Sequence, residues 1–437
     1  MPALRSIGSL AASAALVIVG CTTGGSPPVT GGSPSVGTSM GTDDTPLDTM
    51  AIRARVKWND GSRFALLSPH HGEVITLETD GVLTRDGSLF VGIDHRGDAT
   101  PVTTWDMRRD EKRLLVGPTG NWGVASVGIA GRPTGLTADD HAIVLVDLDS
   151  VDSRRFAVVP LDEGRASTIL EYEPRFTYDA VSPDGRVLYL VETLGGDDPL
   201  AYVVRASDVS TGGLRDGIIV DKRNLEVGAM SGRPIDQTAG DSGWVYTLYQ
   251  GTHHAFVHAL STTDASAVCI DLPDGGAPGG EDDDTAAPAW TLRFDEARGR
   301  LYAANGALGT VVAIDVNGNS VVREVDLAPL RGSAAGATTT ARPIAGAAVV
   351  TSDATTLWVA MAHGLAAVDL ETFEARGPDL VDRSVRSLAR ASDAGSVLAL
   401  DTDGEILRLE ATTGELLASR VPKVGLSIVE LLDGDRP

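Results

Sequence analysis

A pattern of strands repeats along this chain, and polar or ionisable side chains recur at the end of the second strand of each repeat. The ten residues at or beside this position are Asp94, His95, Arg96, Glu192, Gln250, His253, His254, Asn305, His363 and Asp401. Carboxylate, amide and imidazole groups bind peptides, sugars and cationic groups, and carboxylates and amides also ligate divalent metals. We therefore predict a mixed, mostly acidic rim that recognises a ligand. Because loop tips are polar in any soluble protein, ordinary solvated turns are the alternative interpretation.

Three other clusters contain residue types that occur in metal sites. His253 and His254 are adjacent in YQGTHHAFVHAL, but strand alternation directs His258 away from them, so we favour an exposed hairpin tip. The acidic run 282–284 lies in a Gly- and Pro-rich segment that is poorly suited to fixing ligands, which indicates a solvated loop. The run DVNGNS at 315–320 has its glycine out of register for a calcium loop and predicts a hairpin turn. We predict no cofactor, and a divalent metal at the rim is left open.

Signatures of catalysis are missing from the sequence. It contains no G-x-S-x-G nucleophile elbow, no H-E-x-x-H zinc motif, no P-loop and no dinucleotide-binding glycine pattern. Cys269 lies among apolar and small residues in ASAVCIDLP with no base beside it, which predicts a buried thiol rather than a nucleophile. The sequence therefore favours a binding protein over an enzyme.

The first fifty residues have the composition of an export signal followed by a tether. An early Arg precedes an apolar run from Leu10 to Val19, which is too short to span a membrane. The next residues, IVGC, resemble the bacterial lipobox, which implies cleavage after residue 20 and a lipid on Cys21. Residues 21–50 are rich in Gly, Ser, Thr and Pro and predict a flexible tether. The folded domain is then expected at 51–437.

The charge balance narrows the classes of partner. The formal net charge is −24, with four Lys and 32 Arg, so the basic face that nucleic-acid binding needs is missing. The same acidity disfavours adsorption to anionic lipid headgroups. We therefore expect the protein at the extracytoplasmic face of the cell membrane, held there by its lipid anchor alone.

A repeated strand unit predicts the architecture that positions the rim. Each unit has an apolar strand, a turn, a second strand, a polar loop, a third strand ending near Asp, and then a fourth strand. The second strands begin near Gly87, Gly123, Gly185, Gly243, Gly299, Thr355 and Gly395. A spacing of about 40 to 60 residues and the lack of helical periodicity are typical of a β-propeller. We predict an all-β fold with seven four-stranded blades; the strands before Gly87 either complete the last blade or form an eighth.

The motif SPDG in VSPDGRVLYLV predicts the corner of a blade. Pro183 fixes one backbone angle and Gly185 can adopt the left-handed conformation, which closes the hairpin between the first and second strands. The units resemble the strand repeats of bacterial YVTN surface propellers, and SPDG resembles the turn of WD40-like repeats in periplasmic propellers. This resemblance covers most of residues 60–425 and implies the fold rather than one function.

Three functions are compatible with these features. The first is a lipid-anchored binding module that recognises an envelope protein, a peptide or a glycan through the rim. The second is a propeller enzyme, such as a lactonase-like hydrolase, with a metal held by residues such as Glu192, Asn305 and Asp401. The third is a structural subunit of an envelope assembly. We favour the first, since fold alone selects no function.

Overall fold

The computed structural model describes the folded part of the chain. Its contacts divide the chain into two compact units, Met1–Asp44 and Thr45–Pro437, and all described residues belong to the second. The described residues run from 52 to 433, without 59–60, 69–73, 85–86, 95–98, 129–133, 138, 163, 224–227, 241–242, 252–253, 274–289, 328–346, 362 and 423–426. The predicted signal segment, Cys21, the tether and the acidic run 282–284 lie outside them. Within this part of the chain no helix has the length and hydropathy of a membrane span.

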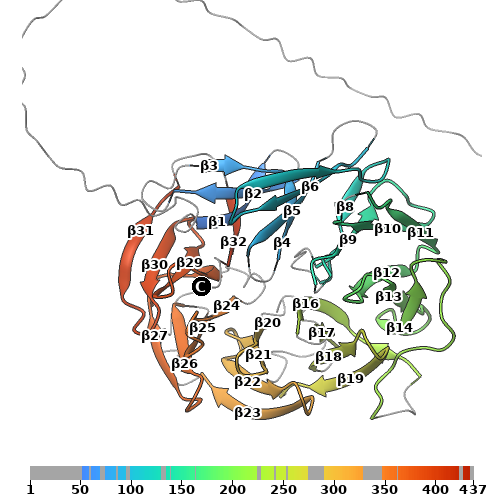
Figure 1. Cartoon of the computed structure of the whole chain (residues 1–437). Coiled ribbons are helices and arrows are strands. Elements are labelled where there is room, and N and C mark those ends of the chain that lie inside the picture. Colours follow the sequence, from blue (N-terminus) through green and yellow to red (C-terminus); the bar gives the residue numbers. More distant parts are fainter. Residues whose placement is uncertain are drawn as a thin grey trace, which may run out of the picture. The chain divides into compact units, whose positions relative to one another are not determined.

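The strands of the second unit pair into eight four-stranded antiparallel sheets. Figure 1 shows these sheets as blades arranged in a ring, with strands such as β4, β16, β20 and β24 nearest the centre. We number the blades along the chain, and blade 1 is described below. Blade 2 contains β4 (Asp80–Leu83), β5 (Leu89–Ile93), β6 (Val102–Asp106) and β7 (Glu111–Leu115), and blade 3 contains β8 (Trp122–Val124), β9 (Ala142–Asp147), β10 (Arg154–Pro160) and β11 (Thr168–Tyr172). Blade 4 contains β12 (Phe176–Val181), β13 (Val187–Thr193), β14 (Ala201–Asp208) and β15 (Met230–Ser231). The fold is a β-propeller, as the repeat pattern predicts.

Blades 5 to 8 have the same strand order. They contain β16 (Arg233–Ala239), β17 (Trp244–Gln250), β18 (Ala255–Ser261) and β19 (Ser266–Asp271); β20 (Trp290–Asp295), β21 (Arg300–Asn305), β22 (Thr310–Asp315) and β23 (Ser320–Asp326); β24 (Ala348–Val350), β25 (Thr356–Ala360), β26 (Leu365–Asp369) and β27 (Ala375–Asp379); and β28 (Val385–Arg390), β29 (Ser396–Asp401), β30 (Ile406–Glu410) and β31 (Leu416–Arg420). Contacts between β16 and β20, β20 and β24, and β24 and β28 link successive first strands.

Blade 1 is built from both ends of the domain. Its strands are β1 (Ile52–Trp58), β2 (Gly61–Leu67) and β3 (Val74–Leu77), and the C-terminal β32 (Ser427–Leu432) pairs with β1 as the innermost strand. The contact of β32 with β28 joins this blade to blade 8. A strand from the C-terminal end thus closes the ring, which leaves no free sheet edge at the join.

The predicted number of seven blades is wrong, because the structure has eight. The unit that begins near Gly395 already has its four strands in β28 to β31, so the N-terminal strands cannot complete it. They combine instead with β32, a strand that the repeat pattern did not assign, and make a whole additional blade. The sequence pattern locates strands, but pairing between the two ends of a chain has no local signal.

The predicted SPDG corner is confirmed, and the same turn recurs in other blades. The Ser182 hydroxyl accepts the N–H of Val187 at 2.9 Å, and Gly185 adopts a left-handed φ of 68°. Equivalent hydroxyl acceptors begin the turns between the first two strands of blades 2, 3 and 7: Thr84, Thr137 and Thr351. A side chain that satisfies a backbone N–H at the corner fixes the hairpin in each of these blades.

Hydrophobic clusters lie between the blades rather than inside them. Each of the eight neighbouring pairs of blades holds its own cluster of buried side chains. Every blade therefore buries both faces, and its strands read as nearly continuous apolar runs, such as AIVLVD in β9. The run DVNGNS forms the turn between β22 and β23, so the predicted hairpin is confirmed.

Removing side-chain volume from the closing strand should weaken the ring. Leu431 on β32 is 3% exposed and packs in the cluster between blades 8 and 1. We expect Leu431→Ala to lower the free energy of unfolding by about 2–5 kcal/mol, measured by urea denaturation. Val429→Ala is the matched control on the same strand, because Val429 is 46% exposed, and we expect it to cost less than about 1 kcal/mol. Similar losses of unfolding free energy in both variants would show that the buried face of β32 does not stabilise the closed ring.

Candidate functional site

The predicted rim has the topology that the sequence suggested. In a blade of four antiparallel strands, the turn between the second and third strands lies on the same face as the connection to the next blade. The ends of β13, β17, β21 and β29 are such positions and carry Glu192, Gln250, Asn305 and Asp401 near or at their last residue. Most of the polar groups at these ends are nevertheless held by neighbours within their own blade.

Asn305 and Asp401 both organise turns. The Asn305 side-chain oxygen accepts the N–H groups of Ala307 and Leu308 at 3.1 and 2.9 Å. Asp401 is 1% exposed, accepts the N–H of Glu405 at 2.8 Å and pairs with Arg383 at 2.7 Å. These contacts occupy the oxygens that a shared metal would need.

The remaining rim residues differ in their burial and in their contacts. Gln250 is half-buried and donates to the Gly251 carbonyl at 3.1 Å. His254 is exposed and lies 3.6 Å from the Asp271 carboxylate, whereas Asp94 and His363 are half-buried. His95, Arg96 and His253 lie outside the described residues. The proposal that the rim acts as one recognition surface stays a prediction.

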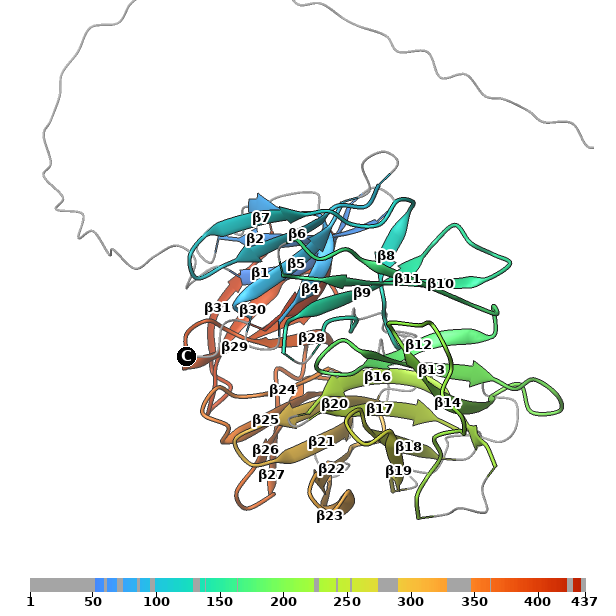
Figure 2. The same cartoon turned by 45° about the vertical axis from the view of Figure 1, so that its right-hand side comes forward.

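A groove beside Glu192 is lined in part by this predicted rim residue. It lies between blades 3 and 4 and has a volume of about 630 Å³. Its lining residues are Asp152, Ser153, Glu171, Tyr172, Glu173, Pro174, Arg175, Phe176, Glu192, Arg205, Gly212 and Leu214. Figure 2 shows blade 4 between blades 3 and 5, so β11 and the connection to β12 form one wall and blade 4 the other.

Glu192 is a buried carboxylate held by two arginines. It is 7% exposed, and its oxygens lie 3.1 Å from Arg175 and 3.5 Å from Arg205. Arg175 also pairs with Glu173 at 3.2 Å, and its guanidinium lies 5.6 Å from the centre of the Phe176 ring. Because a buried charge is costly without partners, this arrangement fixes the side chains at the base of the groove.

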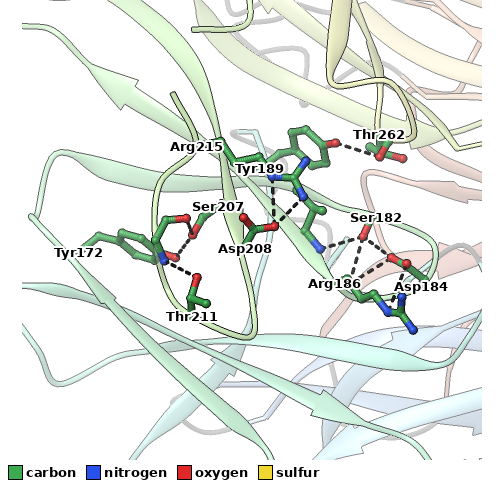
Figure 3. A network of polar contacts seen from close by, with 12 residues as sticks. Tyr172, Ser182, Asp184, Arg186, Tyr189, Ser207, Asp208, Thr211, Arg215 and Thr262 are labelled. Carbon is green, nitrogen blue, oxygen red and sulfur yellow. Dashed lines mark hydrogen bonds and ion pairs between the residues drawn. The ribbon is translucent and has the colours of Figure 1, made fainter. Parts of the chain in front are cut away.

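Polar contacts hold the walls of the groove in place. The Tyr172 hydroxyl of blade 3 lies 2.7 Å from the Ser207 hydroxyl of blade 4. Figure 3 shows this pair beside the ion pair of Asp208 with Arg215, in which a guanidinium nitrogen lies 2.5 Å from a carboxylate oxygen. On the other side of blade 4, Tyr189 donates to the Thr262 carbonyl of blade 5 at 2.8 Å (Figure 3). Hydrogen bonds therefore pin blade 4 to both neighbours.

Sequence reasoning found Glu192 but missed its partners. Arg175 and Glu173 lie in EPR, the short connection between blades, where a Pro flanked by opposite charges is a signal for an ordered turn. Arg205 comes from β14, and nothing in the local sequence indicates that it meets Glu192. The pairing depends on the packing of strands that are distant along the chain.

A second cavity lies between blades 6 and 7 and has a volume of about 330 Å³. It is lined by Arg298, Arg300 and Arg323 around the Tyr302 and Phe373 rings. Arg298 pairs with Asp295 at 3.1 Å, Arg300 pairs with Asp315 at 2.8 Å, and Arg323 donates to the Glu371 carbonyl at 2.6 Å. This cavity is smaller than the groove beside Glu192.

Side chains of four common metal-ligating types, His, Cys, Asp and Glu, do not gather into a metal site in the described part of the chain. No group of three or more His, Cys, Asp or Glu side chains there is close enough to hold an ion. Glu192, Asn305 and Asp401, which the lactonase-like alternative requires together, each bond to residues of their own blade or its connection.

Asp179 is a buried carboxyl with little compensation. It lies on β12, is fully buried, and has one oxygen without a hydrogen-bond partner among the described residues. The Thr247 hydroxyl lies 3.5 Å from the other oxygen. Burial raises the pKa of Asp179 to about 7, against the smaller lowering effect of Thr247.

Comparison with known proteins supports the fold. Two structures of AztD from Citrobacter koseri, one of them the apo form, match over 88% of this chain. The apo structure has 13% identity and a TM-score of 0.50 with 98% of its chain covered, and the other has 12%, 0.51 and 97%. No family model and no curated protein matches the sequence. At this identity the likeness shows a shared propeller fold alone, and membership of the YVTN or WD40-like families stays a prediction.

The raised pKa of Asp179 predicts a pH-dependent stability. Between about pH 4 and 7 the native protein binds one more proton than the unfolded chain, so the free energy of unfolding falls as pH rises. The slope is on the order of 1 kcal/mol per pH unit. We expect Asp179→Asn to remove this contribution. In urea denaturation, the free energy of unfolding of the variant relative to that of the wild type should therefore be higher at pH 8 than at pH 5. An unchanged difference between the two proteins at both pH values would contradict this assignment.

Proposed function

We propose that this protein is a binding module that recognises a basic peptide segment of an envelope protein in the groove between blades 3 and 4. We further propose that a lipid on Cys21 anchors it at the extracytoplasmic face of the cell membrane. The observation that carries the proposal is the groove of about 630 Å³ built around the buried Glu192. A cavity of this size is within the range of ligand sites, and this one combines charged side chains with aromatic ones.

The charges of the groove favour a basic ligand. Four carboxylates line it, from Asp152, Glu171, Glu173 and Glu192, against two guanidinium groups. Arg175 and Arg205 are directed to Glu192, while Asp152 and Glu171 are exposed at the groove edge. Lysine or arginine side chains of a ligand can therefore pair with the edge.

Apolar surface in the same groove suits the rest of a peptide. Tyr172, Phe176 and Leu214 line it, and Leu214 is the most exposed of the three. A peptide with alternating apolar and basic residues would place one set against these rings and the other set against the carboxylates.

The N-terminal segment supports an anchored location. Its export signal and IVGC motif are the features from which the lipid is proposed, and the residues after Cys21 have a tether composition. A flexible tether of this length holds a domain on the order of 30 Å from the membrane. A propeller held at that distance reaches segments of other envelope proteins.

Reversing a charge at the groove edge should weaken peptide binding. The probe is a fluorescein-labelled dodecapeptide of alternating Lys and Leu, and binding to the chain from Thr45 onward is followed by anisotropy. We expect Glu171→Lys to weaken binding by roughly three- to tenfold, because an attraction at an exposed edge becomes a repulsion. The matching Glu and Leu peptide should not bind.

Glu324→Lys is the matched control for this experiment. Glu324 is also an exposed glutamate on the fourth strand of a blade, β23, so both variants change the net charge equally. We expect the control to bind like the wild type. If both variants weaken peptide binding equally, the peptide adsorbs to the acidic protein in general, and the groove is not its binding site.

Lipid attachment has an independent test. We expect Cys21→Ala to move the protein from the membrane fraction to the soluble fraction of a bacterial host, since the anchoring thiol is lost. Mass spectrometry of the wild-type N-terminal peptide should show a diacylglyceryl group on Cys21. A wild-type chain that is already soluble, with an unmodified Cys21, would rule out the anchor but would leave the groove unaffected.

A further inference from the structure

A group of sulfur and ring side chains interrupts the apolar packing between blades 4 and 5. Tyr202 and Tyr249 stack there with their ring centres 4.8 Å apart, and Tyr249 meets the His258 ring edge-on at 6.1 Å. Met230 belongs to the same buried cluster, and Cys269 packs against it. This region lies on the opposite face of blade 4 from the Glu192 groove.

Strand pairing brings three of these side chains together. His258 on β18 lies directly opposite Cys269 on β19, so both side chains are on the same face of blade 5. Across the gap, Met230 on β15 lies opposite Tyr202 on β14. The Cys269 thiol donates to the Met230 thioether, with Sγ and Sδ 3.7 Å apart, and the strand register places His258 beside Cys269 on the same face.

His258 has no hydrogen-bond partner in this environment. Its side chain is 0% exposed, and neither Nδ1 nor Nε2 makes a hydrogen bond with any described group. Leaving a buried polar group unsatisfied costs about 1–3 kcal/mol, and native proteins rarely leave one without a reason. A neutral imidazole has one nitrogen lone pair available for a ligand.

The distance between the two sulfur atoms fits ligation of one ion. Metal–sulfur bonds of about 2.3 Å at the angle of roughly 120° that a three-coordinate ion has place two sulfur ligands about 4.0 Å apart. The observed separation is 3.7 Å. Thiolate and thioether are soft ligands, and together with imidazole they select Cu(I) rather than a hard cation.

The burial of the region also favours a monovalent ion. Cu(I) bound to one thiolate is electrically neutral, whereas a divalent ion with the same ligands leaves a net positive charge in an apolar seam, at a higher desolvation cost. Three charged side chains act on Cys269 at the outer end, those of Asp221, Asp271 and Arg223, and Arg223 pairs with Asp221 at 3.7 Å. Cys269 is only partly buried, which gives an ion a way in from the outer edge.

We propose that His258, Cys269 and Met230 form a buried binding site for Cu(I). On binding, one Cu–S bond replaces the S–H bond of Cys269 and the proton leaves to solvent, while the imidazole and the thioether donate lone pairs. No electron is transferred. The site is separate from the groove of blades 3 and 4 and does not depend on the proposed peptide ligand.

Copper titration of the full chain tests this proposal. A Cys21→Ser background leaves Cys269 as the only thiol of the two in the sequence. Cu(I), kept reduced without oxygen, is titrated against a chromophoric Cu(I) chelator, and the bound ion is examined by X-ray absorption at the copper edge. We expect one tightly bound Cu(I) with two sulfur ligands and one nitrogen ligand.

Two methionine variants separate the site from general copper binding. Met230→Leu preserves volume and should weaken Cu(I) binding by at least about tenfold, since loss of even an outer-shell partner has that effect. Met361→Leu is the control, because Met361 is also buried, in the seam of blades 6 and 7, and we expect it to bind like the parent. Circular dichroism verifies that both variants fold.

Three results would overturn the site. They are the absence of stoichiometric Cu(I), equal affinity of the Met230→Leu variant and the parent, and binding of Zn²⁺ as tight as that of Cu(I). Failure here leaves the groove untouched, because the peptide assay reports on the other face of blade 4.

Discussion

Closure of the ring by β32 is the interaction on which the rest of the structure depends. β32 pairs with β1 and contacts β28, and so it joins the two ends of the domain. Every blade is apolar on both faces, since each of the eight seams contains its own cluster of buried side chains. An open ring would expose the two faces at the break and leave a sheet edge unpaired. Closed, the ring fixes the gap between neighbouring blades.

Both candidate sites depend on fixed gaps between neighbouring blades, because one lies between blades 3 and 4 and the other between blades 4 and 5. Alternation along β13 and β14 sends Glu192 and Arg205 to the blade 3 side and Tyr189 and Tyr202 to the blade 5 side. The Glu192 groove and the proposed site at His258, Cys269 and Met230 therefore lie beside opposite faces of blade 4. Hydrogen bonds from Tyr172 to Ser207 and from Tyr189 to Thr262 hold that blade in register with both neighbours.

The function rests on sites rather than on the fold. The two AztD structures share the architecture at 12–13% identity, which carries no statement about ligands. The groove has acidic edges and aromatic side chains, whereas the seam between blades 4 and 5 has an unsatisfied imidazole on the same blade face as the Cys269 thiol. These two environments differ chemically, so a protein carrying both would bind a peptide and an ion independently of each other.

Local patterns in the sequence determined the repeat, the four strands of each unit, the SPDG corner and the turn at 315–320. Each of these depends on residues close in sequence, such as Gly185, whose left-handed conformation closes a hairpin. The tertiary structure decided the number of blades, because Ile52–Trp58 and Ser427–Leu432 pair across nearly the whole chain. It also decided that Asp401 is buried in an ion pair with Arg383, whereas Glu192 lines a groove. The contact between Met230 and Cys269 likewise depends on the packing of two blades. These outcomes follow from packing between blades, where the partners are set by strand register and ring closure rather than by neighbouring residues.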